Sequence, residues 1–205
     1  MDKVSVSIAM PLYSHVSPIA MINFVGVLQA CWRGGIIGGV SFTRGAFVDA
    51  ARNGLVIDAL NKNPTITHIM WIDSDMVLPT DAVLRLLEDD KPIVGGLYHH
   101  RVDPFDPVAY HLNPFRVLEK LPTSIERVGG LGFGCTLVRA EIYPAMARRF
   151  NDVKWHECKY PDGEDVHFFD RCAEMGIETW LDPLVKCGHI MDEVITSERW
   201  KPQVD

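Results

Sequence analysis

Two aspartates that stand one residue apart carry the strongest chemical signal in the sequence. Asp73 and Asp75 follow the apolar run 69–72, and this pattern is typical of a buried strand with carboxylates at its tip. Side chains alternate along an extended chain, so both carboxylates are expected on one side, where they could share a Mg²⁺ or Mn²⁺ ion. A polar turn that leaves the strand is the alternative interpretation, because short acidic motifs also occur without a metal.

A second group of polar residues lies in the predicted helix 45–61. Arg52 stands on one i, i+4 line with Val48 and Val56, so it leans toward the apolar side of this helix. A buried arginine needs a partner, which is either a structural carboxylate or a ligand phosphate. Asn53 follows Arg52 and shares its surroundings in either case.

The C-terminal third holds further candidates for catalysis and metal binding. Glu164 and Asp165 follow Gly163 and occupy the first turn of a predicted helix. Their carboxylates could simply stabilise the helix by interacting with its macrodipole, or one carboxylate could act as a general base. His189 follows the last predicted strand, where it is either structural or a metal ligand.

Two further stretches have the composition of loops beside a ligand. The glycine-rich segment 129–134, which includes Gly132, precedes a strand and therefore lacks the order of a dinucleotide fingerprint. Its glycines would instead let backbone pass close to a ligand sugar. His99, His100 and Arg101 also follow a strand, and they either line a site or belong to a solvated loop.

Strands and helices are predicted to alternate along most of the chain. The expected strands are 4–10, 36–42, 91–98, 135–138, 179–182 and the run that ends at Ile72, and the expected helices begin at Ser17 and span 45–61, 80–88 and about 164–176. This order predicts an α/β fold with a mostly parallel sheet and helices on both faces. Ligands in such sheets lie at the carboxyl ends of strands. We expect one domain over residues 1–205, with 99–127 as an irregular loop or small subdomain.

Composition and net charge favour some classes of protein over others. The 205 residues are 47% hydrophobic and 23% charged, a globular balance, and the net charge of −7 disfavours a protein that holds duplex nucleic acid by phosphate contacts alone. The five cysteines are scattered and have no CxxC spacing, so a reducing compartment, the cytoplasm, is expected. The N-terminus does not read as a signal peptide, and no apolar run is long enough to span a bilayer.

The order of these motifs resembles that of GT-A fold glycosyltransferases of the family 2 type, from about Val4 to Ile190. The matching parts are a first strand that ends in Pro-Leu-Tyr, an Arg-Asn helix, an Asp-x-Asp tip, glycine-rich loops, Gly-Glu-Asp at a helix start, and a late Gly-His-Ile. The resemblance implies a Rossmann-like sheet and transfer of a sugar from a nucleoside diphosphate sugar, such as a UDP-sugar, to an acceptor hydroxyl.

The resemblance also implies roles for individual residues. The metal, Mn²⁺ or Mg²⁺, would be held by Asp73, Asp75 and His189. Asp165 would be the general base, with Glu164 beside it. The residues that would contact the donor are Pro11, Leu12, Tyr13, Arg52, Asn53, Asp73 and Gly132.

The acceptor is the least defined part of the resemblance. Compact bacteriophage members of this fold look similar, including those that glycosylate hydroxymethylated pyrimidines in DNA, which would place the protein in the host cytoplasm. DNA could still bind despite the acidic net charge if the chain had a local basic patch, formed by Arg33, Arg44, His99, His100 and Arg101. A cell-surface glycan or a protein is the rival acceptor. A nucleotidyltransferase and a noncatalytic nucleotide-sugar binding module are the alternatives from other classes.

Overall fold

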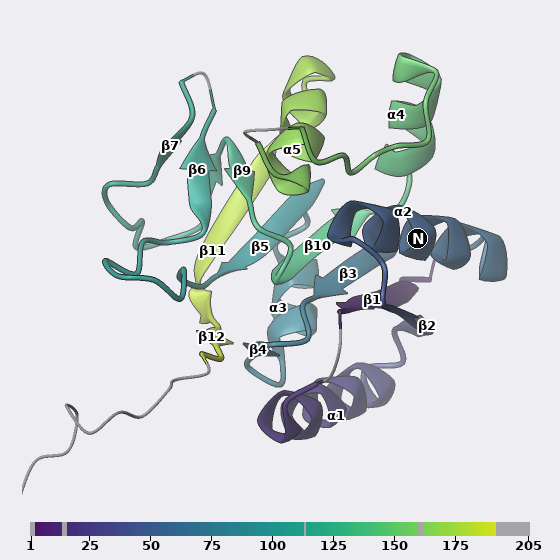
Figure 1. Cartoon of the computed structure of the whole chain (residues 1–205). Helices are drawn as coiled ribbons and strands as arrows, with labels where there is room; N and C mark the ends of the chain where they lie inside the picture. Colours follow the sequence, from purple (N-terminus) through teal and green to yellow (C-terminus); the bar gives the residue numbers. More distant parts are fainter. Residues whose placement is uncertain (1–2, 14–15, 113, 160–161, 192–205) are drawn as a thin grey trace, which may run out of the picture.

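A computed structural model describes residues 3–13, 16–112, 114–159 and 162–191 (Figure 1). A seven-stranded sheet runs through the middle in the order β2-β1-β3-β10-β5-β11-β8. Its strands are β1 (Val6–Leu12), β2 (Ile37–Arg44), β3 (His68–Ile72), β5 (Ile93–Leu97), β8 (Glu126–Val128), β10 (Cys135–Arg139) and β11 (Thr179–Lys186). The strands β10 and β8 run opposite to the other five. The α/β fold with a mostly parallel sheet, predicted from the sequence, is therefore confirmed.

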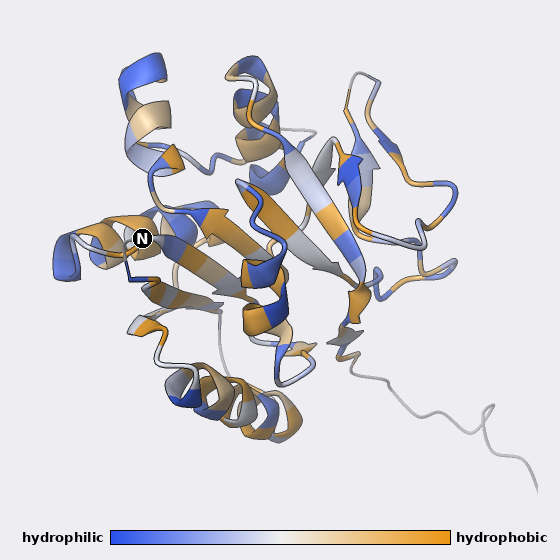
Figure 2. Cartoon of the chain, turned by 180° about the vertical axis from the view of Figure 1, so that it is seen from behind, coloured by the Kyte–Doolittle hydropathy of each residue, from blue (hydrophilic) through white to orange (hydrophobic). Residues whose placement is uncertain are grey.

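Five helices cover the two faces of this sheet in the part of the chain that the structure describes. The helices α1 (Pro18–Arg33) and α3 (Ala82–Glu88) lie on one face, and α2 (Val48–Lys62), α4 (Ile142–Phe150) and α5 (Glu164–Glu174) lie on the other (Figure 1). The strands are correspondingly rich in hydrophobic residues (Figure 2). In β3, Ile69 and Trp71 pack toward α2 and α5, whereas Met70 and Ile72 pack toward α1 and α3. The alternation of side chains along a strand thus divides the core into two layers.

The ends of α1 follow the predicted signals. The hydroxyl oxygen of Ser17 accepts a hydrogen bond from the backbone N–H of Ile19 at 3.3 Å, and Pro18 occupies the first turn. Gly34 caps the C-terminus, and Gly35 then adopts a positive φ of 66°. The polypeptide is thereby turned back into β2, which pairs in parallel with β1.

The remaining short strands form two smaller sheets. The strands β6 (Ala109–His111), β7 (Arg116–Val117) and β9 (Gly130–Leu131) form a three-stranded sheet, and β4 (Met76–Val77) pairs with β12 (Gly188–His189). The segment 99–127, expected as a loop or small subdomain, therefore contains β6, β7 and the start of β8. The pairing of β4 with β12 brings His189 next to the chain that follows Asp75.

Candidate functional site

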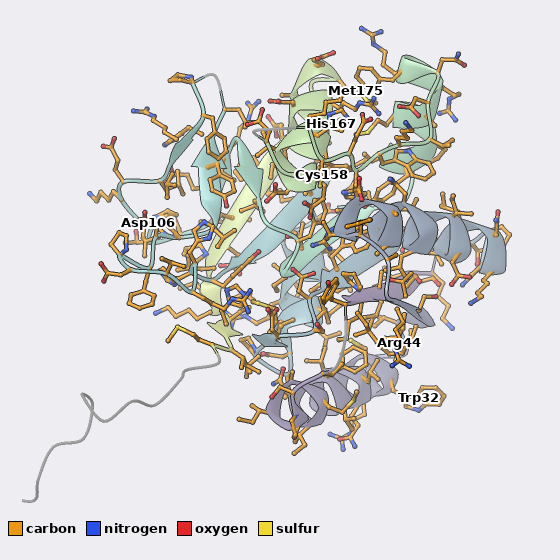
Figure 3. The ribbon with its side chains drawn as sticks, in the orientation of Figure 1. Trp32, Arg44, Asp106, Cys158, His167 and Met175 are labelled. Carbon is orange, nitrogen blue, oxygen red and sulfur yellow. The ribbon has the colours of Figure 1, made fainter. Side chains whose placement is uncertain are left out.

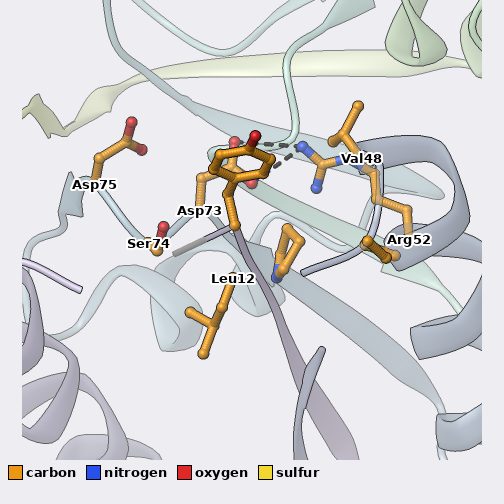
Figure 4. Close-up of a pocket in the computed structure, with 10 residues that line it drawn as sticks. Leu12, Val48, Arg52, Asp73, Ser74 and Asp75 are labelled. Carbon is orange, nitrogen blue, oxygen red and sulfur yellow. Dashed lines mark hydrogen bonds and ion pairs between the residues drawn. The ribbon is translucent and has the colours of Figure 1, made fainter. Parts of the chain in front are cut away.

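A cavity opens at the carboxyl ends of β1 and β3, where parallel sheets bind ligands. Its volume is about 170 Å³, and Figure 4 shows the side chains that line it. Its lining is mainly apolar, and the charged side chains in it are Arg52, Asp73 and Asp75. The lining residues are Pro11, Leu12, Tyr13, Ala46, Val48, Ala51, Arg52, Asp73, Ser74 and Asp75.

The two aspartates of the motif lie in a turn rather than in an extended strand. The strand β3 ends at Ile72, and the N–H of Met76 donates to the carbonyl of Asp73 at 3.2 Å. The alternation expected from an extended chain therefore does not apply, and the two carboxylates have different partners. Figure 4 shows them on either side of Ser74, with Asp73 facing Arg52 and Asp75 standing apart.

Arg52 joins Asp73 to Glu164. Its Nη2 donates to Oδ1 of Asp73 at 3.0 Å and its Nε to Oε1 of Glu164 at 3.0 Å, while only 3% of the residue is exposed. Burial raises the pKa of Asp73, and the adjacent guanidinium partly offsets that effect. Of the two partners that the sequence left open for Arg52, the structure shows the carboxylate.

Asp75 contacts a histidine and an arginine. Its Oδ2 lies 3.5 Å from Nε2 of His189 and 2.9 Å from Nη1 of Arg101. The Nδ1 of His189 lies 2.8 Å from the carbonyl oxygen of His99, and because a carbonyl only accepts, Nδ1 carries the proton. Burial by itself lowers the pKa of His189, but its bonds to Asp75 and His99 outweigh this and raise it.

The side chains of Asp75 and His189 have the chemistry of ligands to a divalent cation such as Mn²⁺. A carboxylate oxygen and an imidazole nitrogen suit this class of metal, and a second bond from the distal ring nitrogen is the usual way to orient a histidine ligand. Among residues 3–13, 16–112, 114–159 and 162–191, however, no three His, Cys, Asp or Glu side chains form one metal-holding group. Asp73 is bound to Arg52, so the structure brings together only Asp75 and His189 of the three predicted ligands.

Asp165 is a partly buried carboxylate with a raised pKa. Burial raises its pKa to about 6, and the neighbouring charge of Glu164 adds to that effect. Its Oδ1 accepts the N–H of Val166 at 2.8 Å, which leaves Oδ2 for a proton. The carboxylate of Glu164 forms an ion pair with Arg52, and this contact links α5 to α2.

Two residues expected beside the donor have other contacts. The side-chain amide of Asn53 forms two hydrogen bonds with the backbone of His156. Its Nδ2 donates to the carbonyl of His156 at 2.7 Å, and its Oδ1 accepts the N–H of His156 at 3.0 Å. Gly132 is buried against Tyr98, whose hydroxyl would collide with any Cβ at that position. Neither residue lines the cavity.

Two further groups lie near the aspartates, and the sequence patterns do not single out the first of them, Tyr98. Tyr98 is buried, accepts the N–H of Gly134 at 3.1 Å, and has a pKa raised by burial and then by the charge of Asp73. The sequence assigns Arg101 either to a site or to a solvated loop, and the structure pairs it with Asp75. The position of Arg101 after the predicted strand 91–98 indicated that it could lie near the site. No sequence pattern distinguished Tyr98 from the other residues of that strand.

The remaining members of the basic patch considered for DNA are dispersed. Arg33 ends α1 and Arg44 ends β2, whereas the Nε2 of His100 lies 3.2 Å from the hydroxyl of Tyr110 in the small sheet. Arg101 is bound to Asp75. These residues therefore do not form one continuous basic surface.

Comparisons with solved structures agree with the fold. The A197 protein from STIV aligns over 92% of this chain and 87% of its own, with a TM-score of 0.58 and 16% identity. GalNAc-T7, solved with UDP, GalNAc and Mn²⁺, aligns over 93% of this chain with a TM-score of 0.58 and 11% identity. This chain spans only 44% of that GalNAc-T7 chain. No protein-family model and no curated protein matches the sequence. At these identities the similarity establishes a GT-A-like fold.

Proposed function

We propose that this protein is a metal-dependent glycosyltransferase that moves a sugar from a nucleoside diphosphate sugar to an acceptor hydroxyl. The observation that carries the proposal is the pairing of Asp75, which lines the cavity, with His189, whose Nδ1 is bonded to the carbonyl of His99. A similar fold in GalNAc-T7, solved with UDP and Mn²⁺, supports the same assignment.

The lining of the cavity suits the donor in polarity, because apolar and charged side chains both contribute to it. Pro11, Leu12 and Tyr13 would border the nucleoside, and the diphosphate would extend toward the Asp73–Asp75 turn. Asp75 and His189 would hold Mn²⁺ or Mg²⁺, and Asp73 is the third ligand that the resemblance implies. When bound, the cation neutralises the charge that develops on the leaving diphosphate.

Asp165 would receive the proton of the acceptor. As the acceptor oxygen bonds to the anomeric carbon and the bond from that carbon to the diphosphate breaks, the hydroxyl proton passes to Oδ2 of Asp165. A carboxylate with a pKa of about 6 is ionised at neutral pH and is still basic enough to accept a proton. The acceptor itself is a glycan, a protein or a hydroxymethylated pyrimidine in DNA, and salt-dependent binding to modified DNA would identify the last.

Thermal unfolding with metal and donor tests the proposal. The probes are Mn²⁺ alone, a panel of nucleoside diphosphates and their sugars alone, and each pair of the two. At a hundredfold excess over Kd, binding stabilises the native state by about 2.7 kcal/mol, which corresponds to roughly 5–10 °C in a chain of this size. A shift that requires both Mn²⁺ and one nucleotide is expected.

Variants separate a functional site from a polar turn. Asp75→Ala should abolish both the metal-dependent shift and the transfer of sugar without unfolding the protein, whereas Asp106→Ala, which removes an exposed aspartate from a loop, should change neither. Full transfer activity in Asp75→Ala would contradict the metal assignment. A shift with nucleotide sugar but no transfer to any acceptor would indicate a binding module instead.

A further inference from the structure

Helix α1 is apolar on the side that faces solvent as well as on the side that faces the sheet. Its inner side packs Ala20, Phe24, Val27 and Cys31 into the core. Its outer side exposes Ile22 at 74% and Trp32 at 76%, and it also exposes Ile19, Met21 and Val25. A surface helix normally turns polar residues outward, so an outer side of this composition indicates a partner.

The apolar surface continues onto the edge strand β2. Phe42 is 48% exposed, and its ring meets that of Phe24 edge to face at 5.8 Å, which places it on the α1 side of the sheet. Arg44 stands two residues further along β2 and so projects to the same side. We call the exposed residues Ile19, Met21, Ile22, Val25, Trp32 and Phe42 the α1 face. Figures 1 and 2 show α1 at the outer edge of the molecule, and Figure 3 shows Trp32 pointing away from its body.

The stretch of sequence that supplies the α1 face carries a charge opposite to that of the rest of the chain. Residues 4–48, which include α1 and β2, contain no aspartate or glutamate, although the chain has 27 acidic residues. Arg33 and Arg44 give this stretch a formal charge of +2, so the remainder of the chain carries −9. An anionic surface would therefore repel most of the molecule and attract this part of it.

This charge pattern favours a lipid surface over a second copy of the chain. In a two-fold dimer through the α1 face, Arg33 and Arg44 of both copies would enter one interface, and residues 4–48 offer no carboxylate to pair with them. An anionic bilayer accepts both features, because its headgroups pair with arginine while apolar side chains and Trp enter the interfacial region.

We propose that the α1 face docks the protein on the surface of an anionic lipid bilayer. The helix would lie in the plane of the interface, with Ile22 and Trp32 inserted and the two arginines at the lipid phosphates. No helix in the portion of the chain that the structure describes is long and apolar enough to cross a membrane.

Docking in this way would also orient the candidate active site. Asn23 on α1 forms two hydrogen bonds of 2.8 Å with the backbone N–H and carbonyl of Leu78, three residues beyond Asp75. The helix is thereby tied to the segment that leaves the Asp73–Asp75 turn. A protein held by α1 would present the cavity at a fixed position relative to the bilayer.

Vesicle co-sedimentation tests the proposal without donor or metal. The wild-type chain is expected to bind phosphatidylcholine vesicles that contain phosphatidylglycerol, and to bind pure phosphatidylcholine more weakly. Ile22→Asp should lower the partition coefficient roughly tenfold or more, because it removes an inserted side chain. Arg33→Glu should lower it at least about fivefold, because each cation at an anionic surface contributes about 1 kcal/mol.

Matched variants on other surfaces provide the controls. Ile57→Asp replaces an exposed isoleucine on α2, and Arg148→Glu reverses an exposed arginine on α4, so both should bind vesicles as the wild type does. Circular dichroism confirms that each variant is folded. Equal binding by Ile22→Asp and wild type would overturn the proposal. So would absence of vesicle binding together with a dimer, seen by sedimentation, that Ile22→Asp dissociates.

Discussion

Asp165 is the residue whose environment makes the most specific kinetic prediction. Its pKa of about 6 lies well above the ordinary value of 3.8, because the carboxylate is buried beside Glu164. A general base must be ionised, so kcat/KM for transfer should rise about tenfold per pH unit below pH 6 and level off above it. A pH profile of initial rates measures this. Asp170→Asn, on the same helix, should keep the profile, and a rate that does not change between pH 5 and 7 would contradict the assignment.

The same pKa also predicts a change in stability. A carboxyl whose pKa is higher in the folded state destabilises that state once pH exceeds its unfolded value, and the penalty is complete above pH 6. Asp165→Asn should therefore raise the free energy of unfolding at pH 8, by at most about 3 kcal/mol at 1.36 kcal/mol per pKa unit. Below pH 4 the two proteins should be equally stable. Urea unfolding at both pH values measures the difference, and a less stable variant at pH 8 would show that the ionised carboxylate is structural.

Arg101 makes a prediction about the affinity for metal. Its guanidinium lies 2.9 Å from the Oδ2 of Asp75, the oxygen that faces His189, so a cation bound there must compete with it. Arg101→Ala should strengthen Mn²⁺ binding by about 1.5- to 5-fold, which corresponds to the 0.2–1 kcal/mol of an exposed ion pair. Calorimetry without donor measures this affinity. Arg116→Ala, which removes another exposed arginine, is the control, and weaker Mn²⁺ binding by Arg101→Ala would show that Arg101 does not compete.

At the scale of elements, Arg52 connects three elements of the fold beside the candidate site. It belongs to α2, and its two carboxylate partners come from the end of β3 and the start of α5. Its guanidinium also lies over the rings of Trp71 and Phe133, at 5.5 and 5.0 Å from their centroids. The position of α5, and with it that of Asp165, therefore depends on Arg52.

Removal of Arg52 should destabilise the protein strongly. Arg52→Ala leaves Asp73 and Glu164 without their partner, and loss of one member of a buried ion pair costs about 3–5 kcal/mol. Arg148→Ala, on the exposed side of α4, should change stability by less than about 0.5 kcal/mol. Chemical denaturation gives both values. A loss below about 1 kcal/mol for Arg52→Ala would mean that water replaces the guanidinium without strain.

At the scale of the whole molecule, two hydrophobic layers share one sheet. Leu86 belongs to the layer under α1 and α3, and Phe168 belongs to the layer under α2, α4 and α5. Because the same strands contribute alternate side chains to both layers, neither layer can unfold without disrupting the other. We infer that the chain unfolds as one domain.

Truncation on either face should therefore lower a single transition. Leu86→Ala is expected to cost about 2–5 kcal/mol and Phe168→Ala about 3–5 kcal/mol, since both side chains are fully buried. Circular dichroism and tryptophan fluorescence should report the same midpoint in each variant. Val153→Ala, at an exposed position, is the control. Two separated transitions would show that the layers unfold independently.

Local patterns in the sequence determined most of the long strands and helices, and they also determined the edge of the sheet at which the candidate site lies. Helix α1 begins after Ser17 as predicted, and the apolar run before Asp73 forms β3, because caps and period-two alternation act within a few residues. The helix α4 was not predicted. The acidic tip was correctly placed at the end of a strand, but its backbone turns where extension was expected.

Tertiary structure alone decided which of these side chains meet. Arg52 is 112 residues from Glu164, and His189 is 90 residues from the carbonyl of His99 that fixes its tautomer. Such contacts depend on strand order, and strand order is set by packing across the whole sheet rather than by neighbouring residues. The pKa of Asp165 is likewise a property of burial, which no local pattern specifies. The chain therefore encodes the reactive groups locally, and the fold selects their partners and charges.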